Sequence, residues 1–194
     1  MYKRFVLAPL LALLFATVAL ASVFVYYPLY ITATPTEPKL VFDSGSNANQ
    51  PDIGTGNQIQ VSIGENKTFA SITIHPTYQE NYYKNVLNIT NGDDNAVNVS
   101  IIFTSVDNEL PSGSNVTMII YCRGTRINLL NITLPEENKP IWIGQIDKDN
   151  VWEIDFYVYI PEGTYIMNKS YTAIAKLVYT PSPETPPSEP SKGR

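Results

Sequence analysis

The stretch VWEIDFYVYI, residues 151–160, decides the fold class of this chain. Alternate positions within it are all apolar, namely Trp152, Ile154, Phe156, Val158 and Ile160. Glu153 and Asp155 occupy positions between them. Such alternation is typical of a strand that turns one face to a hydrophobic core and the other face to water. We therefore predict a half-buried strand with the apolar side chains in the core and both carboxylates exposed.

Strand-like segments recur along most of the chain, and turn-forming Gly, Asn, Asp and Pro residues separate them. No segment after Ile31 sustains a helical period. We expect strands at residues 39–43, 58–63, 69–75, 83–90, 96–105, 115–122, 125–133, 139–143, 151–160 and 171–180. Short strands at this spacing predict an all-β fold, an antiparallel β-sandwich or jelly roll, over residues 39–180.

Two connections carry recognisable turn signals. Asn91-Gly92-Asp93-Asp94 predicts a hairpin between its flanking strands, and Arg123-Gly124 predicts a two-residue hairpin. In the last predicted strand one face carries Tyr171, Ala173, Ala175, Leu177 and Tyr179. We expect that face to close the core.

An apolar leader precedes the domain. Phe5–Ile31 contains no charged residue and follows Lys3 and Arg4, and about 20 apolar residues suffice to cross a bilayer. Three interpretations stay open: a signal peptide at residues 1–21 with cleavage after Ala21, a retained membrane anchor, or a pilin-type leader cut beside the basic residues. We expect an extracellular or cell-surface protein, which contacts a membrane only if the leader is retained.

Residues 22–38 form a distinct connecting segment. Val23–Ile31 is apolar and aromatic, and residues 34–38 (TPTEP) form a stiff linker because proline fixes φ. An unpaired apolar strand in water invites aggregation, whereas insertion beside a strand of a second copy pairs its backbone and buries its side chains. We therefore predict a donor strand. The face expected to enter a groove, which leaves Pro28 outside, comprises Val23, Val25, Tyr27, Leu29 and Ile31, and the other face comprises Phe24, Tyr26 and Tyr30.

Composition narrows the classes of partner. The net charge is −5 over 194 residues, and basic clusters are few, which argues against nucleic-acid binding because that requires a basic surface. Residues 181–194 are rich in Pro, Ser and Glu and predict a flexible tail. The single cysteine, Cys122, excludes an intramolecular disulfide. We favour a small buried side chain there over a bond between chains.

Asn-x-Ser/Thr sequons without a middle proline are the most informative motif, and they begin at Asn66, Asn88, Asn98, Asn115, Asn131 and Asn168. Six sequons in an exported domain predict an N-glycosylated surface protein, although Asn, Ser and Thr also occur on solvated strand faces without any glycan. Asn98 is expected to point away from the core. Asn131 shares a face with Ile127 and Leu129, which we expect in the core, so its site needs a bulge or stays unused.

Residues suited to catalysis or metal binding are sparse. His75 is the only histidine, and zinc sites need several Cys or His ligands. The clusters Asp93-Asp94 and Asp147-Lys148-Asp149 offer oxygen ligands but match no calcium-binding loop. No glycine-rich phosphate-binding motif is present. We predict no enzymatic activity, no catalytic residue, no metal and no cofactor.

The stretch YKNVLNITNGDDNAVNVSIIF, residues 83–103, resembles the strand–turn–strand segment of TasA/camelysin-like secreted proteins. Their relatives include archaeal bundling-pilus and thread subunits, and the order of a leader followed by a jelly roll is also similar. The resemblance covers this segment and the overall layout, and the chain departs from the pattern in carrying Pro28 within its donor strand. It implies a subunit that polymerises by donor-strand complementation, in which an N-terminal strand enters a groove of the next subunit.

These observations predict a secreted, glycosylated structural subunit of an extracellular filament whose protein partner is a second copy of itself. A head-to-tail contact that does not close propagates as a filament. Two alternatives stay open. One is a membrane-anchored β-sandwich ectodomain that acts in adhesion or in a surface layer. The other is a secreted enzyme that works with carboxylates alone, such as a glycosidase pair.

Overall fold

The structure is a computed structural model that describes residues 27–163 and 165–181. The chain divides into two compact units, Met1–Thr36 and Glu37–Arg194. The leader at residues 1–21 and most of the Pro-rich tail lie outside the described residues. Within the described ranges, no helix is long and apolar enough to cross a membrane.

The second unit is built of β-strands, as alternation predicts. The strands in the described residues are β1 (Leu40–Ser44), β2 (Gln60–Ile63), β3 (Ala70–Thr73), β4 (Gln79–Asn91), β5 (Val97–Asn108), β6 (Asn115–Cys122), β7 (Thr125–Asn131), β8 (Pro140–Ile146), β9 (Val151–Ile160) and β10 (Tyr171–Thr180). Each overlaps one segment predicted from the sequence. β4 extends furthest beyond its predicted bounds, to 13 residues.

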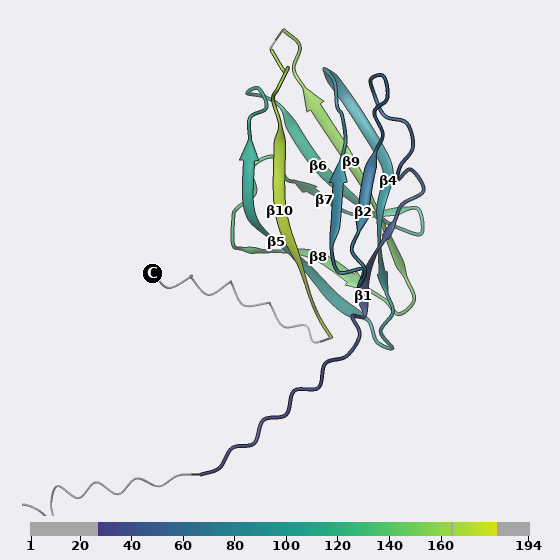
Figure 1. Ribbon diagram of the computed structural model, residues 1–194, viewed down its shortest axis with the longest axis vertical. Coiled ribbons are helices and arrows are strands. Elements are labelled where there is room, and N and C mark those ends of the chain that lie inside the picture. The colour runs from purple at the N-terminus through teal and green to yellow at the C-terminus, as the bar shows by residue number, and fades with distance from the viewer. Residues whose placement is uncertain (1–26, 164, 182–194) are drawn as a thin grey trace, which may run out of the picture. The chain divides into compact units, whose positions relative to one another are not determined.

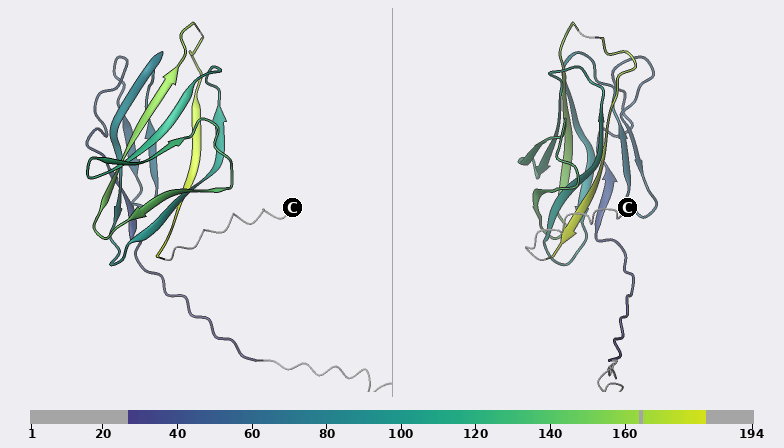
Figure 2. Two further views of the ribbon diagram at one scale, coloured as in Figure 1. Left: turned by 180° about the vertical axis from the view of Figure 1, so that it is seen from behind. Right: turned by 90° about the vertical axis from the view of Figure 1, so that its left-hand side faces the viewer.

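The strands form a sandwich of antiparallel sheets (Figures 1 and 2). One layer is a five-stranded sheet in the order β1-β4-β9-β6-β7. The facing layer contains a three-stranded sheet, β10-β5-β8, and the separate hairpin β2-β3. All pairings between these strands are antiparallel. The predicted all-β sandwich is therefore confirmed.

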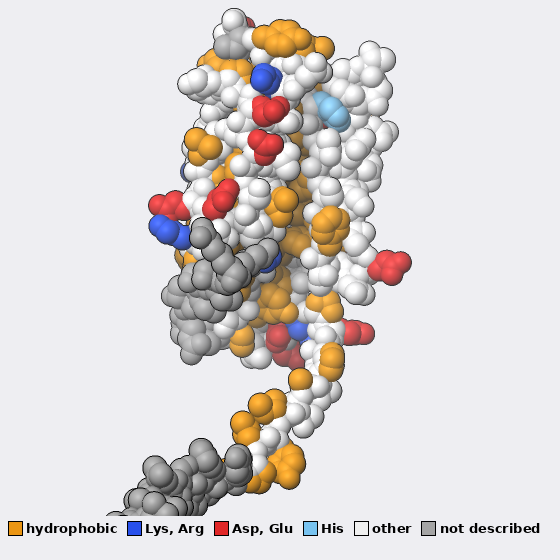
Figure 3. Space-filling view, turned by 60° about the vertical axis from the view of Figure 1, so that its left-hand side comes forward, with side chains coloured by type: hydrophobic (Ala, Val, Ile, Leu, Met, Phe, Trp, Pro, Cys, Tyr) orange, Lys and Arg blue, Asp and Glu red, His pale blue; other side chains and the backbone are white. Residues whose placement is uncertain are grey.

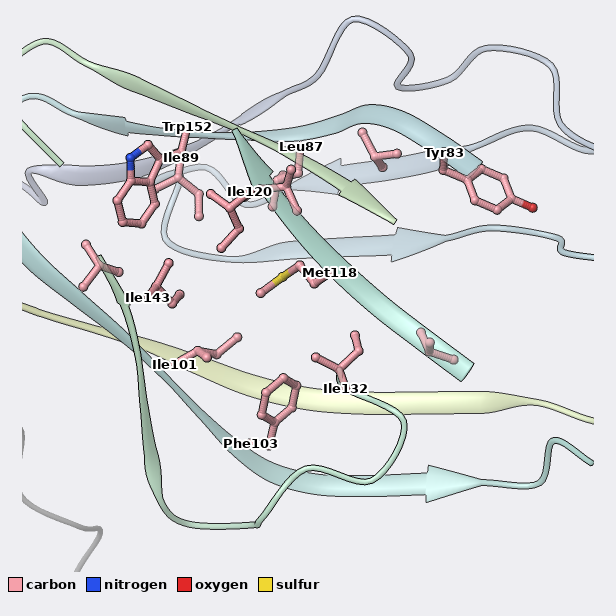
Figure 4. Packing of buried hydrophobic residues seen from close by; sticks show 14 of the residues in the cluster. Tyr83, Leu87, Ile89, Ile101, Phe103, Met118, Ile120, Ile132, Ile143 and Trp152 are labelled. Carbon is pink, nitrogen blue, oxygen red and sulfur yellow. The ribbon is translucent and has the colours of Figure 1, made fainter. Parts of the chain in front are cut away.

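The core lies between the two layers. Figure 4 shows Trp152, Ile89 and Ile120 from the five-stranded sheet facing Ile101 and Phe103 from β5. Burying a large apolar side chain contributes roughly 1.5–3 kcal/mol. The described core side chains from β9 are Trp152, Ile154, Val158 and Ile160, with Phe156 half-buried against them. The predicted inward face of β9 is therefore correct.

One of the two predicted turns joins neighbouring strands of one sheet, and the other joins strands of two different sheets. Arg123 and Gly124 join β6 to β7 as a hairpin, and both lie in the left-handed region with φ of 51° and 77°, as a type I′ turn requires. The turn from Asn91 is not a hairpin, because β4 and β5 belong to different sheets. It carries the chain across the sandwich instead. The buried side chain of Asn91 fixes this crossing, since its Nδ2 donates a hydrogen bond to the carbonyl of Ile146 at 3.0 Å.

A bulge in β4 changes the outer face of β9. The register between β4 and β9 shifts between Tyr83 and Leu87, and Asn85 within the bulge has a φ of 42°. The backbone N–H of Asn85 donates a hydrogen bond to Asp155 Oδ1 at 2.6 Å. Asp155 does lie opposite the core face, as predicted. It is only 2% exposed, however, so the predicted solvation of this carboxylate is wrong.

Gly45 supports the same bulge from the loop after β1. Its backbone N–H donates to the carbonyl of Val86 at 3.0 Å. A Cβ atom on Gly45 would lie 2.1 Å from the carbonyl oxygen of Asn85. The close approach of two backbones therefore requires glycine at this position.

Candidate functional site: an open groove beside β10

The last strand leaves core-facing side chains uncovered. Opposite residues of an antiparallel pair share a face, so Ala175 lies on the face of Phe103, and Tyr179 lies on the face of Val99. Phe103 is 2% exposed and Val99 is fully buried. Across the same ladder, Tyr179 is 40% exposed and Ala175 is also exposed. On the same face of β10, Tyr171, Ala173 and Leu177 are half-buried and pack against the core. The predicted face of the last strand is therefore right, and it closes the core in part, because only Ala175 and Tyr179 on this face stay exposed.

The β2-β3 hairpin provides the opposite wall. It packs on the core through Val61, Ile63, Ala70 and Ile72, which stay half-buried. Within the described residues, no hydrogen-bonded ladder joins this hairpin to the three-stranded sheet. Figure 3 shows hydrophobic side chains in a hollow that runs along the sandwich between these two parts. We call this hollow the β10 groove, bounded by β10 and by the β2-β3 hairpin.

The length of the groove wall matches that of the predicted donor strand. β10 contains 10 residues, which span about 33 Å at the usual rise of a strand. Val23–Ile31 spans about 30 Å at the same rise. A single extended segment of that length therefore suits the groove.

The described part of the donor segment is uncovered. Residues 27–36 form neither helix nor strand. Tyr27, Leu29 and Ile31 are exposed, and so is Tyr30 from the other predicted face. Val23 and Val25 lie outside the described residues. The choice of an inward face for this segment stays a prediction.

The sequon asparagines differ in accessibility. Asn66, Asn131 and Asn168 are exposed, Asn88 and Asn115 are half-buried, and Asn98 is buried. Asn115 is also engaged, because its Oδ1 accepts a hydrogen bond from Thr133 Oγ1 at 3.1 Å. A glycan needs a side-chain nitrogen that reaches solvent. The geometry therefore favours the three exposed asparagines as sites of N-glycosylation.

The structure corrects the orientation expected for Asn131 and the exposure expected for Asn98. Ile127 and Leu129 are exposed, and Leu130 packs on the core instead. The face shared by Asn131 with Ile127 and Leu129 is thus the outer one, and Asn131 needs no bulge to reach solvent. Asn98 lies on the face opposite the core residues Val97 and Val99, as predicted, but it is only 8% exposed on the middle strand of the three-stranded sheet.

His75 is paired with a buried carboxylate. Asp52 Oδ2 accepts a hydrogen bond from the backbone N–H of His75 at 2.7 Å and lies 2.9 Å from its Nδ1. The hydroxyl of Tyr83 is buried near the Asp52 carboxylate. Burial, and next the charge of Asp52, raise the pKa of Tyr83. These contacts anchor the loop before β2 to the residues that follow β3, so they support the hairpin wall.

The remaining candidate residues have local partners. Lys148 Nζ lies 2.8 Å from Asp94 Oδ1, and this hydrogen bond lowers the pKa of Asp94 and raises the pKa of Lys148. In the described part of the chain, no group of three His, Cys, Asp or Glu side chains is placed to hold a metal ion. Cys122 is a free thiol, half-buried against the core.

Sequence reasoning missed a polar cluster on the outer face of the five-stranded sheet. Tyr82 Oη donates to Asp155 Oδ2 at 2.5 Å and lies 3.3 Å from Tyr121 Oη. Lys84, Gly124 and Glu153 complete the lining of a pocket of about 330 Å³. Burial, and next the bond to Asp155, raise the pKa of Tyr82. The signal in the sequence was the carboxylate of Asp155 within the apolar strand β9, and both of its hydrogen-bond partners come from β4.

A comparison with protein-family models finds no match for this chain, and neither does a search of curated proteins.

Proposed function

We propose that the protein is a secreted, N-glycosylated structural subunit of an extracellular filament that assembles by donor-strand complementation. Val23–Ile31 of one copy enters the β10 groove of the next copy. One observation carries the proposal: Ala175 and Tyr179 lie on the core side of the sandwich and stay exposed. A strand added beside β10 would cover both.

Burial of the donor side chains supplies the driving force. Tyr27, Leu29 and Ile31 are exposed before assembly, and covering each large apolar side chain contributes roughly 1.5–3 kcal/mol. Backbone hydrogen bonds to the edge of a sheet add affinity, as in other cases of β-strand addition. Ordering the segment opposes association. The free energy gained by burying the apolar side chains must exceed the entropic cost of ordering the segment.

The linker supports a regular spacing between subunits. Residues 32–38 contain two prolines, and such a segment extends over about 22 Å as a semi-rigid spacer. It separates the donor strand from Leu40, where β1 begins. A donor in one place and a groove in another form a heterologous contact, which propagates without closing.

A peptide experiment tests the proposal directly. The compact unit Glu37–Arg194 is prepared alone and titrated with the synthetic peptide SVFVYYPLYIT, residues 22–32. We expect binding, and we expect a Leu29→Asp peptide to bind at least roughly tenfold more weakly because it places an unpaired charge in the groove. A Tyr30→Asp peptide is the matched control, since the same charge lies on the opposite face and should be tolerated.

Variants of the groove complete the test. Ala175→Arg places a long cation in the groove and should abolish peptide binding and polymer formation. Ile174→Arg, on the outer face of the same strand, should retain both, because Ile174 is already exposed. Circular dichroism must show that each protein is folded. A folded unit that ignores the peptide overturns the donor-strand mechanism, and a full chain that then stays monomeric in the membrane fraction supports the anchored ectodomain.

A further inference from the structure

We propose that the outer face of the five-stranded sheet binds a neutral saccharide in the pocket between Tyr82, Tyr121, Lys84 and Glu153. The pocket has a volume of about 330 Å³, which lies at the lower end of the range for small-ligand sites. It is formed by β4, β9, β6 and the turn after β6, and it lies on the sheet face that points away from the core. The proposal does not depend on filament assembly.

Asp155 positions the phenol of Tyr82. Its Oδ2 accepts the Tyr82 hydroxyl at 2.5 Å, and its Oδ1 accepts the Asn85 N–H at 2.6 Å. The proton of Tyr82 is thereby committed to Asp155, and the phenol oxygen keeps its capacity to accept hydrogen bonds. Tyr121 Oη lies 3.3 Å from it. The two hydroxyls form a fixed pair whose remaining hydrogen-bonding capacity is available to a ligand.

Lys84 and Glu153 add a donor and an acceptor that are not already paired. Neither side chain takes part in an ion pair found in the described residues. The ammonium group offers three donors, and the carboxylate accepts through both oxygens. Gly124 keeps the remaining side open, because a Cβ atom there would meet nothing within 4 Å. The site therefore has polar groups of both kinds and room beside them.

The combination of charges selects the class of ligand. An anion would meet the carboxylates of Asp155 and Glu153, and a cation would meet Lys84. A neutral ring with several hydroxyls can donate to Glu153, accept from Lys84 and pair with the phenols. Its C–H face can lie against the apolar body of a tyrosine ring. A hexopyranose unit has this chemistry.

The test is an NMR titration of ¹⁵N-labelled protein made without glycans, so that attached sugars do not compete. The probes are cellobiose, lactose and N,N′-diacetylchitobiose. We expect at least one of them to shift the amide signals of Asn85 and Gly124 with a Kd of about 1–10 mM, a weak affinity in free-energy terms. Glucuronate and glucosamine, which carry opposite charges, should produce smaller shifts at equal concentration.

Surface variants separate binding from folding. Lys84→Ala and Glu153→Ala remove side chains that no described contact requires, and each should weaken saccharide binding roughly tenfold, as expected when a charged hydrogen-bonding group is lost. Tyr157→Phe, on the same sheet face but outside the pocket lining, is the matched control and should bind normally. The proposal is overturned if all three disaccharides leave folded protein unshifted up to about 50 mM. It is equally overturned if both alanine variants bind as well as the parent.

Discussion

Asp155 and Asn85 are joined across a strand bulge: the carboxylate of the first accepts the backbone N–H of the second at 2.6 Å. Asp155→Ala should lower the free energy of unfolding by about 2–3 kcal/mol, because it leaves that N–H without its partner. Glu153→Ala, two residues away on the same face, should stay within about 0.5 kcal/mol. Urea denaturation measures both. Equal effects would show that the bulge does not rely on this bond.

The two tryptophans give a contrasting pair. Trp152 is 1% exposed in the core and Trp142 is 54% exposed on β8. Trp152→Ala should destabilise the domain by about 3–5 kcal/mol, the usual effect of truncating a buried aromatic side chain, and Trp142→Ala by less than about 1 kcal/mol. Chemical denaturation of both variants is the measurement. A larger loss for Trp142→Ala would contradict the arrangement of the sheets.

Glycan occupancy should follow exposure. We expect at least three of the six sequons to be modified, with Asn66, Asn131 and Asn168 occupied. Asn98 should be free of glycan, because its side chain is buried. Mass spectrometry of peptides from protein purified from the cells that make it measures each site. Six unmodified asparagines would remove glycosylation from the proposed function, and a fully occupied Asn98 would contradict its placement.

Stability should fall at alkaline pH. Burial raises the pKa of Tyr171 to about 12, and its hydroxyl donates to the carbonyl of Ile132. An unfolded tyrosine titrates near about 10. The stabilisation is therefore complete below pH 10 and is lost as the pH rises through about 12, because the unfolded chain releases its proton first.

The variant Tyr171→Phe tests whether Tyr171 causes this loss of stability as the pH rises. The variant should lose about 1 kcal/mol at pH 7 with its hydrogen bond and should decline less steeply than the parent between about pH 10 and 12. Burial also raises the pKa of Tyr83, so part of the fall in stability with pH should remain in the variant. Denaturation measured across that pH range decides the matter. A parallel decline in both proteins would exclude Tyr171 as the cause.

Strand positions could be predicted because they depend on local alternation. The apolar face of β9 contains five side chains in strict order, and only the core can satisfy such a face. β7 was harder, since its sequence TRINLLN carries apolar residues on both faces. Its register against β6 shifts near Tyr121, and Ile127 and Leu129 end outside. Alternation alone does not say which face turns inward.

The candidate sites depend on neighbours that are distant in the chain. The environment of Asp155 is set by Tyr82 and Asn85, some 73 and 70 residues earlier. β10 has an uncovered edge because, within the described residues, no hydrogen-bonded ladder joins it to the β2-β3 hairpin. Pairing across such separations follows from the global topology. The donor segment could be proposed from its composition, whereas the β10 groove could be described only from the structure.

The layer that faces the five-stranded sheet is divided into the three-stranded sheet β10-β5-β8 and the separate hairpin β2-β3. This division has a thermodynamic consequence. If a strand of another copy fills the space between them, that layer is completed only when two molecules associate, so its completion depends on their concentration. A ligand that binds only the folded state raises stability by RT ln(1 + [L]/Kd), which is about 2.7 kcal/mol at a hundredfold excess over Kd. The melting temperature of the unit Glu37–Arg194 would then rise with the concentration of the added segment. A dilute subunit would be less stable than the same subunit inside a filament.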